Sequence, residues 1–392
     1  MLGFDSVAGW IFWGSLVLLG YIYAGYPLIA AARARLRPKA RIVAPIEPTV
    51  SIIVVAHNEG RCIARRIDNL LALDYPADRL EIVVASDGST DDTVAQARAY
   101  RDAGVIVTAF ATRRGKAAVL SGTVPTLHGE IVLFADARQR FDRDTLRVLV
   151  ANFADPTVGG VSGELVLTTR TRSAAVSHGT AFYWRCEKFI RSTEGKADST
   201  VGATGAIYAI RRALFEPIPE DTILDDVLVP LRIVRRGYRV LFEPGARAFD
   251  DASASARQEF VRKVRTIAGT FQLFARERWL LNPRRNRLWF ETISHKAARL
   301  ILPVLHVLLF ASAAALMANP LFATAFLLQV GFYTAALIGY SQRHSRHRAF
   351  VFSVPCALCL LYWATIVGFI RFLMKRQQAT WERVPASTRL AS

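Results

Sequence analysis

The chain contains three long uncharged stretches, and a long segment of mixed polarity separates the first from the second. Three stretches contain no Asp, Glu, Lys or Arg: residues 6–32, 300–342 and 349–370. A membrane-spanning helix needs about 20 apolar residues. The first and third stretches can therefore each cross once, and the second can cross twice, with a turn at Asn319-Pro320. We predict transmembrane helices at residues 6–32 and 349–371, and two more within 300–342.

Residues 45–283, between the first two stretches, alternate short apolar runs with amphipathic patterns. Each apolar run predicts a buried strand, and the runs cover residues 50–56, 81–86, 105–108 and 131–135. Ser89, followed by Asp92 three residues later, resembles a capping box that begins a helix. Strands that alternate with helices predict an α/β domain of Rossmann type, with a mostly parallel sheet and right-handed crossovers.

Basic residues beside the uncharged stretches predict the orientation in a membrane. Five Lys or Arg residues lie between positions 33 and 41, and such flanks stay in the cytoplasm. We therefore expect the N-terminus outside and the domain at 45–283 in the cytoplasm. Residues 284–299 have the basic and aromatic pattern of an interfacial helix. A fourth crossing would place the basic tail at 372–392 outside, so either the rule yields there, or one C-terminal segment is re-entrant or lies in the interface.

The composition agrees with a membrane protein. Hydrophobic residues make up 52% of the chain and charged residues 21%, which excludes an ordinary soluble protein. The net charge of +18 would suit nucleic acid, but the sequence contains no recognition module. Anionic lipid headgroups and a polyanionic lipid-linked acceptor explain the charge more simply. The four cysteines give no disulfide framework for a cytoplasmic domain, and Cys356 and Cys359 lie in an apolar stretch, where we expect them to pack.

Acidic residues stand where two predicted strands end. Asp87 follows the run 81–86 and Asp136 follows 131–135, and the carboxyl ends of strands form the crevice where open α/β sheets bind ligands. Asp87 could accept hydrogen bonds from a base or a ribose, although Asp-Gly-Ser-Thr is also good turn chemistry. Asp136 could hold a divalent cation on a diphosphate, since Mg²⁺ often takes only one or two protein carboxylates. The alternative is a surface Asp after a strand.

Three further kinds of motif carry candidate chemistry. Asp225-Asp226 could supply a general base whose neighbour positions it, or two ordinary partners of a helix dipole. The small residues of Gly202–Gly205 permit close backbone approach to a ligand, or form a packing corner. Cations in Arg113–Lys116 and Arg262–Arg265 could contact a pyrophosphate, or form solvated and headgroup-facing surfaces.

Taken together and in this order, the motifs resemble the membrane-bound family 2 glycosyltransferases of bacteria, relatives of the cellulose, chitin and hyaluronan synthases. The motifs are A-H-N-E at 56–59, S-D-G-S at 86–89, A-D-A-R at 135–138, G-A-T-G-A at 202–206, L-D-D-V-L with R-R-G-Y-R within 224–239, and R-K-V-R at 262–265. The resemblance covers residues 48–275. It implies a GT-A fold, a nucleotide diphosphate sugar donor, Mg²⁺ or Mn²⁺, and inversion at the anomeric centre.

The resemblance also implies roles for single residues. Those that would bind the donor nucleotide lie in the strand-end and basic motifs: Asn58, Glu59, Asp87, Lys116, Asp136, Arg138, Arg262 and Arg265. Asp136, which matches the first acid of the family's D-x-D, would also bind the metal. Those near the acceptor sugar form one glycine-rich segment: Gly202, Ala203, Thr204 and Gly205. Asp226 matches the second acid of the family's E-D pair and would be the general base, with Asp225 in place of the Glu.

Two positions depart from the family pattern. The second acid of D-x-D is Arg138, so metal binding would rest on Asp136 and phosphate oxygens, or Arg138 would supply part of the positive charge. The Q-x-x-R-W of processive members is replaced by Arg262-Lys263-Val264-Arg265-Thr266. Arg265 keeps its place, but the Trp is absent, which favours limited transfer over synthesis of a long chain.

The sequence therefore predicts an inverting enzyme that moves one sugar from a UDP-sugar to a membrane-associated acceptor. The acceptor would be lipid-linked, an oligosaccharide or a polysaccharide, in bacterial envelope or exopolysaccharide assembly. The alternatives are a processive synthase that also exports its polymer, and an inactive membrane subunit that binds a nucleotide. Four or fewer crossings give a narrow bundle, so an export pore would need a homo-oligomer. Nucleic acid is the least favoured partner.

Overall fold

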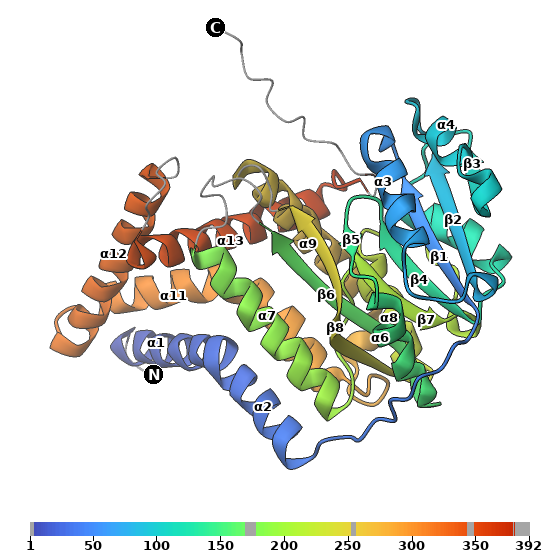
Figure 1. Cartoon of the computed structure of the whole chain (residues 1–392). Helices are drawn as coiled ribbons and strands as arrows, with labels where there is room; N and C mark the ends of the chain where they lie inside the picture. Colours follow the sequence, from blue (N-terminus) through green and yellow to red (C-terminus); the bar gives the residue numbers. More distant parts are fainter. Residues whose placement is uncertain (1–3, 169–177, 252–255, 343–348, 379, 381–392) are drawn as a thin grey trace, which may run out of the picture.

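The computed structural model describes residues 4–168, 178–251, 256–342, 349–378 and 380. Figure 1 shows a body of sheet and helices joined to a group of long helices, which come from both ends of the chain (blue, and orange to red). The candidate chemistry of the sequence lies in the body. The long helices contain the uncharged stretches.

Within the described residues, eight strands form one mixed sheet in the order β3-β2-β1-β4-β7-β6-β8-β5. β1 to β4 are parallel to their neighbours in this group, whereas β7 runs antiparallel to β4 and β6. The strands are β1 (Val50–Ala56), β2 (Leu80–Asp87), β3 (Val105–Phe110), β4 (Ile131–Asp136), β5 (Arg140–Phe141), β6 (Val158–Thr168), β7 (Ile207–Arg211) and β8 (Arg239–Asp251). The predicted α/β fold with a mostly parallel sheet is confirmed.

The parallel strands are unbroken apolar runs because helices cover both of their faces. One face packs against α3 (Gly60–Leu71), α4 (Thr93–Arg98) and α6 (Thr145–Val150). The other packs against α5 (Lys116–Thr123) and α8 (Asp225–Arg235). Since β2 and β4 run in the same direction, their last residues, Asp87 and Asp136, lie at the same edge of the sheet. This edge positions the candidate site.

The helix after β2 differs from the predicted capping box. α4 begins at Thr93 with Asp92 as its N-cap residue, and the Asp92 side chain makes no capping bond to the first N–H groups of the helix. The Ser89 hydroxyl instead accepts the N–H of Asn58 at 3.1 Å and a hydrogen bond from the Ser86 hydroxyl at 2.9 Å. The capping box was wrong because Ser89 joins the loops that follow β1 and β2.

The remaining helices are long and largely apolar, or connect the body to the apolar ones. They are α1 (Phe4–Gly20), the π-helical turn η1 (Tyr21–Gly25), α2 (Tyr26–Leu36), α7 (His178–Ala197), α9 (Ala256–Arg276), α10 (Trp289–Glu291), the π-helical turn η8 (Thr292–Ala297), α11 (Leu302–Ala315), α12 (Pro320–Ser341) and α13 (Phe350–Leu373). In the part of the chain that the structure describes, three are long and apolar enough to cross a membrane: Ser6–Leu36, α12 and α13. A fourth candidate is the bent pair Trp289–Leu300 and Leu302–Ala315, whose axes meet at 59°.

The segment predicted as an interfacial helix at 284–299 becomes helical only at Trp289. The buried side chain of Asn286 holds a turn before it, donating to the carbonyl oxygen of Leu280 at 3.0 Å and accepting the N–H of Leu288 at 3.0 Å. These two bonds fix the angle at which the chain leaves the body for α11.

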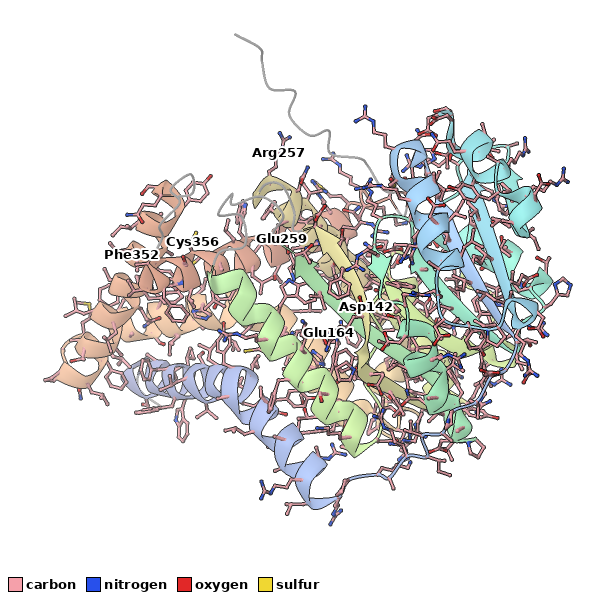
Figure 2. The ribbon with its side chains drawn as sticks, viewed as in Figure 1. Asp142, Glu164, Arg257, Glu259, Phe352 and Cys356 are labelled. Carbon is pink, nitrogen blue, oxygen red and sulfur yellow. The ribbon has the colours of Figure 1, made fainter. Side chains whose placement is uncertain are left out.

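The C-terminal end of α13 packs against α9 of the body. The Phe271 ring lies 5.0 Å from that of Phe369 and 5.9 Å from that of Phe372, centroid to centroid. The other end of α13, where Figure 2 labels Phe352 and Cys356, packs against α12. At Gly339 of α12 a Cβ would lie only 2.9 Å from the Cβ of Cys356. The chain beyond α13 therefore starts at the α/β body.

Candidate active site

A lysine ammonium joins acids from two elements at the carboxyl edge of the sheet. Lys116 begins α5, and its Nζ lies 2.9 Å from Oδ1 of Asp136 at the end of β4. The same Nζ lies 3.6 Å from Oδ2 of Asp225 at the start of α8. Burial by itself lowers the pKa of Lys116, but the charges of Asp136, Asp225 and Asp226 raise it above the ordinary value. The lysine therefore stays charged and holds two distant parts of the chain in one site.

Asp226 lies beside this lysine, in the first turn of α8. Its Oδ2 accepts the N–H of Gly205 at 3.1 Å, and its carbonyl oxygen accepts the N–H of Ala203 at 2.7 Å. Burial, followed by the charge of Asp225, raises the pKa of Asp226 to about 6, although Lys116 opposes this rise. A carboxylate whose pKa lies near the working pH is suited to act as a general base.

Tyr208 and Arg265 border the acids from β7 and α9. The Tyr208 side chain is buried. Burial, the charges of Asp225 and Asp226 and a hydrogen bond with Asp225 raise the pKa of Tyr208 well above its ordinary value. Arg265 donates to the carbonyl oxygen of Ile223 at 3.3 Å, and its pKa is lowered by burial while the same acids oppose the change. A buried hydroxyl and a guanidinium therefore lie beside the carboxylates of the candidate site.

Asp87 positions the loop that carries Lys116. Its two carboxylate oxygens accept the main-chain N–H groups of Arg114, at 2.6 Å, and Gly115, at 2.9 Å. Gly88, with a φ of +58°, lets the two loops touch, because a Cβ there would lie 2.5 Å from the nitrogen of Arg113. Asp87, which we predicted to bind the nucleoside, thus uses both carboxylate oxygens to hold the backbone next to Lys116.

Asn58, Glu59 and Arg138 connect the loops after β1, β2 and β4. The Asn58 side chain accepts the N–H of Thr90 at 2.8 Å. Glu59 is buried and receives a forked pair of bonds from Arg138, at 2.9 Å from Nε and 2.6 Å from Nη2 to the same Oε1. Arg138, which replaces the second acid of the D-x-D pattern, is therefore directed toward Glu59.

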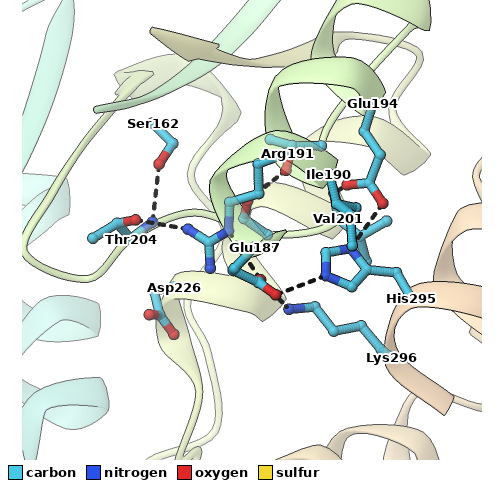
Figure 3. Close-up of polar contacts among 12 residues, drawn as sticks. Ser162, Glu187, Ile190, Arg191, Glu194, Val201, Thr204, Asp226, His295 and Lys296 are labelled. Carbon is cyan, nitrogen blue, oxygen red and sulfur yellow. Dashed lines mark hydrogen bonds and ion pairs between the residues drawn. The ribbon is translucent and has the colours of Figure 1, made fainter. Parts of the chain in front are cut away.

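The glycine-rich segment contacts the acid that we predicted as the base. Besides the bond from Gly205 to Asp226, the N–H of Thr204 donates to the Ser162 hydroxyl at 3.0 Å. Arg191 of α7 donates from Nη1 to the Thr204 hydroxyl at 2.7 Å, and Figure 3 shows this bond beside Asp226. The structure therefore brings the predicted acceptor segment and the predicted base together.

Arg262 lies apart from this group. Its guanidinium is bonded to Glu259 on the preceding turn of α9, and its side chain is 42% exposed. Burial raises the pKa of Asp250 near the end of β8, and the charge of Arg262 only opposes this rise; Arg262 contacts none of the three acids near Lys116. Of the two predicted arginines of α9, only Arg265 lies beside those acids.

The comparisons with known proteins agree with this geometry. Residues 51–218 match the signature of the family described as Glycosyl transferase family 2. This region is a family 2 glycosyltransferase domain. The predicted family resemblance and the GT-A fold are confirmed by a solved mannosyltransferase from Pyrobaculum calidifontis in complex with GDP-Man and Mn²⁺. Its TM-score is 0.70 at 26% sequence identity, and the match covers 92% of this chain and 98% of that chain.

Curated relatives of the glycosyltransferase domain are named for different transferred sugars or products. An N-acetylglucosaminyltransferase of Azorhizobium caulinodans is 27% identical over 223 residues, which are 52% of this chain and 55% of that protein. A beta-monoglucosyldiacylglycerol synthase of Synechocystis is 28% identical over 207 residues, which are 49% and 42% of the two chains. The chain thus spans about half the length of the curated relatives it matches.

The glycosyltransferase domain does not contain a metal cage made of protein alone. Among the described residues, no group of three or more His, Cys, Asp and Glu side chains could hold a metal ion. Asp136 is a partly exposed carboxylate (32% of its side chain), and Arg138 stands where a second acid would be. One such carboxylate fits a cation that takes its other ligands from water and donor phosphates.

Sequence reasoning missed several residues of this region. Arg191, which contacts the acceptor segment, and its partner Glu187 were not singled out, and neither was His295 from the segment before α11. A signal for α7 existed, because Glu187, Arg191 and Glu194 recur at intervals of four and three and so share one helix face. His295 had no comparable signal, because its partners are more than a hundred residues away.

Proposed function

We propose that the chain is an inverting glycosyltransferase that moves one sugar from a UDP-sugar to a membrane-associated acceptor in bacterial envelope or exopolysaccharide assembly. The observation that carries this is the group formed by Lys116, Asp136, Asp225 and Asp226 at the carboxyl edge of a family 2 domain. The acceptor would be lipid-linked or a saccharide. Because the Pyrobaculum neighbour was solved with GDP-Man, a GDP-sugar is the alternative donor.

Asp226 is the base in the proposed reaction. Its carboxylate takes the proton of an acceptor hydroxyl as that oxygen attacks the anomeric carbon from the face opposite the diphosphate. The bond to the diphosphate breaks, and its electron pair leaves with the phosphate oxygen, so the configuration inverts in one displacement. The acceptor hydroxyl would be placed by the Gly202–Gly205 segment, whose amide already contacts Asp226 at 3.1 Å. Holding both reactants in line contributes much of the rate.

Positive charge near the departing diphosphate would come from Lys116 and Arg265. Both side chains are largely buried, and a preorganised charge has more effect where water is excluded. Mg²⁺ or Mn²⁺, when bound, would add Lewis-acid stabilisation of the diphosphate, and Asp136 is the carboxylate that would hold it. Asn58, Glu59 and Arg138 would form the nucleoside side of the site.

The membrane arrangement follows from the helix packing and the basic flanks. We place the glycosyltransferase domain on the cytoplasmic side of the bacterial inner membrane, beside the basic residues 33–41. Since the C-terminal end of α13 packs on α9 through Phe271, we infer that residues 374–378, which follow α13, begin on the same side. α12 and α13 would then make only one full crossing between them. This arrangement keeps the basic residues at the end of α13 in the cytoplasm, as the positive-inside rule requires.

Nucleotide release tests the proposal. Full-length protein in nanodiscs would be supplied with UDP-, GDP- and TDP-sugars and membrane lipid extracts, with and without EDTA. We expect UDP release that requires lipid extract and falls on chelation, and a product that gains a single sugar. Saturable UDP binding with neither transfer nor hydrolysis of any nucleotide sugar would establish the inactive nucleotide-binding subunit instead. A long labelled polymer would establish a processive synthase.

A further inference from the structure

Three ionisable residues share the buried face of α7. Glu187, Arg191 and Glu194 follow one another at helical spacing, and the two carboxylates are 5% and 2% exposed. Arg191 bonds Glu187 through Nε at 3.2 Å. Burying two carboxylates on one face is costly unless each is fully paired, so partners must come from other elements.

Those partners come from the segments that connect the domain to the apolar helices. His295, in the π-helical turn η8, is fully buried between the two acids, with Nδ1 2.7 Å from Glu194 and Nε2 3.2 Å from Glu187. Each ring nitrogen of His295 thus contacts a different carboxylate of α7. Arg299 donates to Glu187 at 2.8 Å, and the Tyr26 hydroxyl of α2 donates to Glu194 at 2.5 Å. We call Glu187, Glu194, His295, Arg299 and Tyr26 the junction network.

Arg191 extends from the junction network to the active site. Figure 3 shows its guanidinium between Glu187 and Thr204. The Thr204 hydroxyl accepts from Nη1 at 2.7 Å, and the next residue, Gly205, donates its N–H to Asp226 at 3.1 Å. One side chain thus spans the distance from an anchored helix to the turn that holds the proposed base.

We propose that Arg191 is a positioning residue that fixes the Thr204–Gly205 turn against Asp226, and that the junction network makes this position depend on the membrane-linked helices. The inference rests on the proposed function only for the role of Asp226. The anchor is rigid because each acid is bonded by two groups from outside α7. Glu187 is bonded to His295 and Arg299, and Glu194 is bonded to His295 and Tyr26. A change in the packing of α2 or η8 against α7 would therefore shift the Arg191 guanidinium, and with it the Thr204–Gly205 turn that contacts Asp226.

Charge gives Arg191 a second effect on Asp226. The ionisable groups that face Asp226 are Asp225 beside it, Lys116 of α5, Arg191 of α7, Tyr208 of β7, Arg265 of α9 and Lys296 of η8. The cations Lys116, Arg191 and Lys296 lower the pKa of Asp226, against burial and Asp225, which raise it. Removing the charge of Arg191 moves this pKa upward, whereas a variant that keeps the charge leaves this contribution in place.

Two variants of Arg191 and one control separate these effects. R191Q removes both the charge of Arg191 and the guanidinium that bonds Glu187 and Thr204. R191K keeps the charge, and R185Q changes an exposed arginine of the same helix. For R191Q we expect kcat to fall about 10²-fold, as for a misplaced reacting group, and the acidic limb of the kcat/KM profile to move up by about one pH unit. R191K should lose rate but keep the wild-type limb, and R185Q should match wild type in both.

Hydrogen exchange gives a readout that does not need turnover. In full-length protein in nanodiscs, the amides of Thr204 and Gly205 should exchange faster in R191Q than in wild type or R185Q. Y26F, which removes only the hydroxyl bonded to Glu194, should also speed this exchange, by a smaller factor. Exchange in R191Q equal to that in R185Q would overturn the positioning role, and unchanged exchange in Y26F would overturn its dependence on the membrane-linked helices. Absence of sugar transfer in wild type would refute the proposed function and leave the exchange result to judge this inference.

Discussion

Two ion clusters differ in their charge balance. One lies at the edge of the sheet, and the other lies where α7 meets the segments that lead to the apolar helices. Near the sheet edge, Asp136, Asp225 and Asp226 surround Lys116, and acids outnumber the nearest cation. Around Glu187, a single carboxylate contacts the four basic side chains of Arg191, His295, Lys296 and Arg299. Burial acts on both Asp226 and Glu187, so the charges nearby strongly affect which protonation state each acid prefers.

The pKa values show the consequence of this difference. Burial raises the pKa of both Asp226 and Glu187, but Asp225 adds to the rise at Asp226, whereas His295, Lys296 and Arg299 bring the pKa of Glu187 well below its ordinary value. Asp226 can therefore exchange a proton near neutral pH, while Glu187 stays ionised. The first arrangement suits proton transfer, and the second suits a fixed structural contact.

The largest expected effect is the loss of proton transfer at Asp226. D226N preserves the shape of the side chain and its acceptor oxygen but cannot take a proton. We expect the rate of sugar transfer, measured as nucleotide release, to fall by about 10²–10⁴-fold. D78N, at an exposed aspartate far from the sheet edge, is the matched control and should keep the wild-type rate. Full activity in D226N would show that the base is another residue.

Neutralising Glu187 should cause the next largest effect, on stability. E187Q leaves His295, Arg299 and Lys296 buried around a neutral group, and breaking a buried pair costs about 3–5 kcal/mol. The loss should be full at pH 7 and diminish as the pH falls below about 4, because the folded pKa of Glu187 lies below its ordinary value. Thermal unfolding of E216Q, whose side chain is 49% exposed and pairs with Arg236 at 3.9 Å, should stay within about 0.5 kcal/mol of wild type.

In contrast to E187Q, the substitution D226N should increase the free energy of unfolding. The folded pKa of Asp226 is about 6 and its ordinary value is 3.8, so the ionised form destabilises the fold as the pH rises from about 4 to about 6. D226N should therefore be more stable than wild type at pH 7, by up to about 3 kcal/mol. The difference should vanish below about pH 4, where the carboxyl is neutral in both states. A variant that is less stable at pH 7 would contradict the acid surplus at the sheet edge.

The smallest effect is a shift of the pH profile caused by Lys116. In K116Q the cation that opposes the raised pKa of Asp226 is absent, so the acidic limb of kcat/KM, which we expect near pH 6 in wild type, should move up by about one unit. R98Q, at an exposed arginine of α4, should leave the limb in place. A limb in K116Q that moves to lower pH would mean that another group controls it.

The sheet-edge cluster could be predicted from sequence, and the junction network could not. Asp87 and Asp136 follow apolar runs that became β2 and β4, and the topology of parallel strands places such residues at one edge. The role given to Asp87 was less secure, since its contacts with Arg114 and Gly115 depend on a loop conformation that no local pattern encodes. The junction network needs the mutual packing of α2, α7 and η8, and no spacing links its acids on α7 to their partners on the other elements.

Local patterns also failed where a side chain had a tertiary partner. Ser89 has the composition of a cap but bonds Asn58 and Ser86. The helix expected from 284 begins at Trp289 because Asn286 is buried in a turn. The number of crossings could not be decided from charge alone, whereas the packing of Phe369 on α9 places the end of α13 at the body.

The pair formed by Arg138 and Glu59 limits how this site can change over evolutionary time. A single replacement of Arg138 by Asp would restore the acid of the usual motif, but it would remove the guanidinium that donates to the buried Glu59 and bring a second carboxylate toward it. The route to a two-acid site therefore passes through a paired substitution at positions 59 and 138, and lineages with Arg at one of these positions should keep an acid at the other.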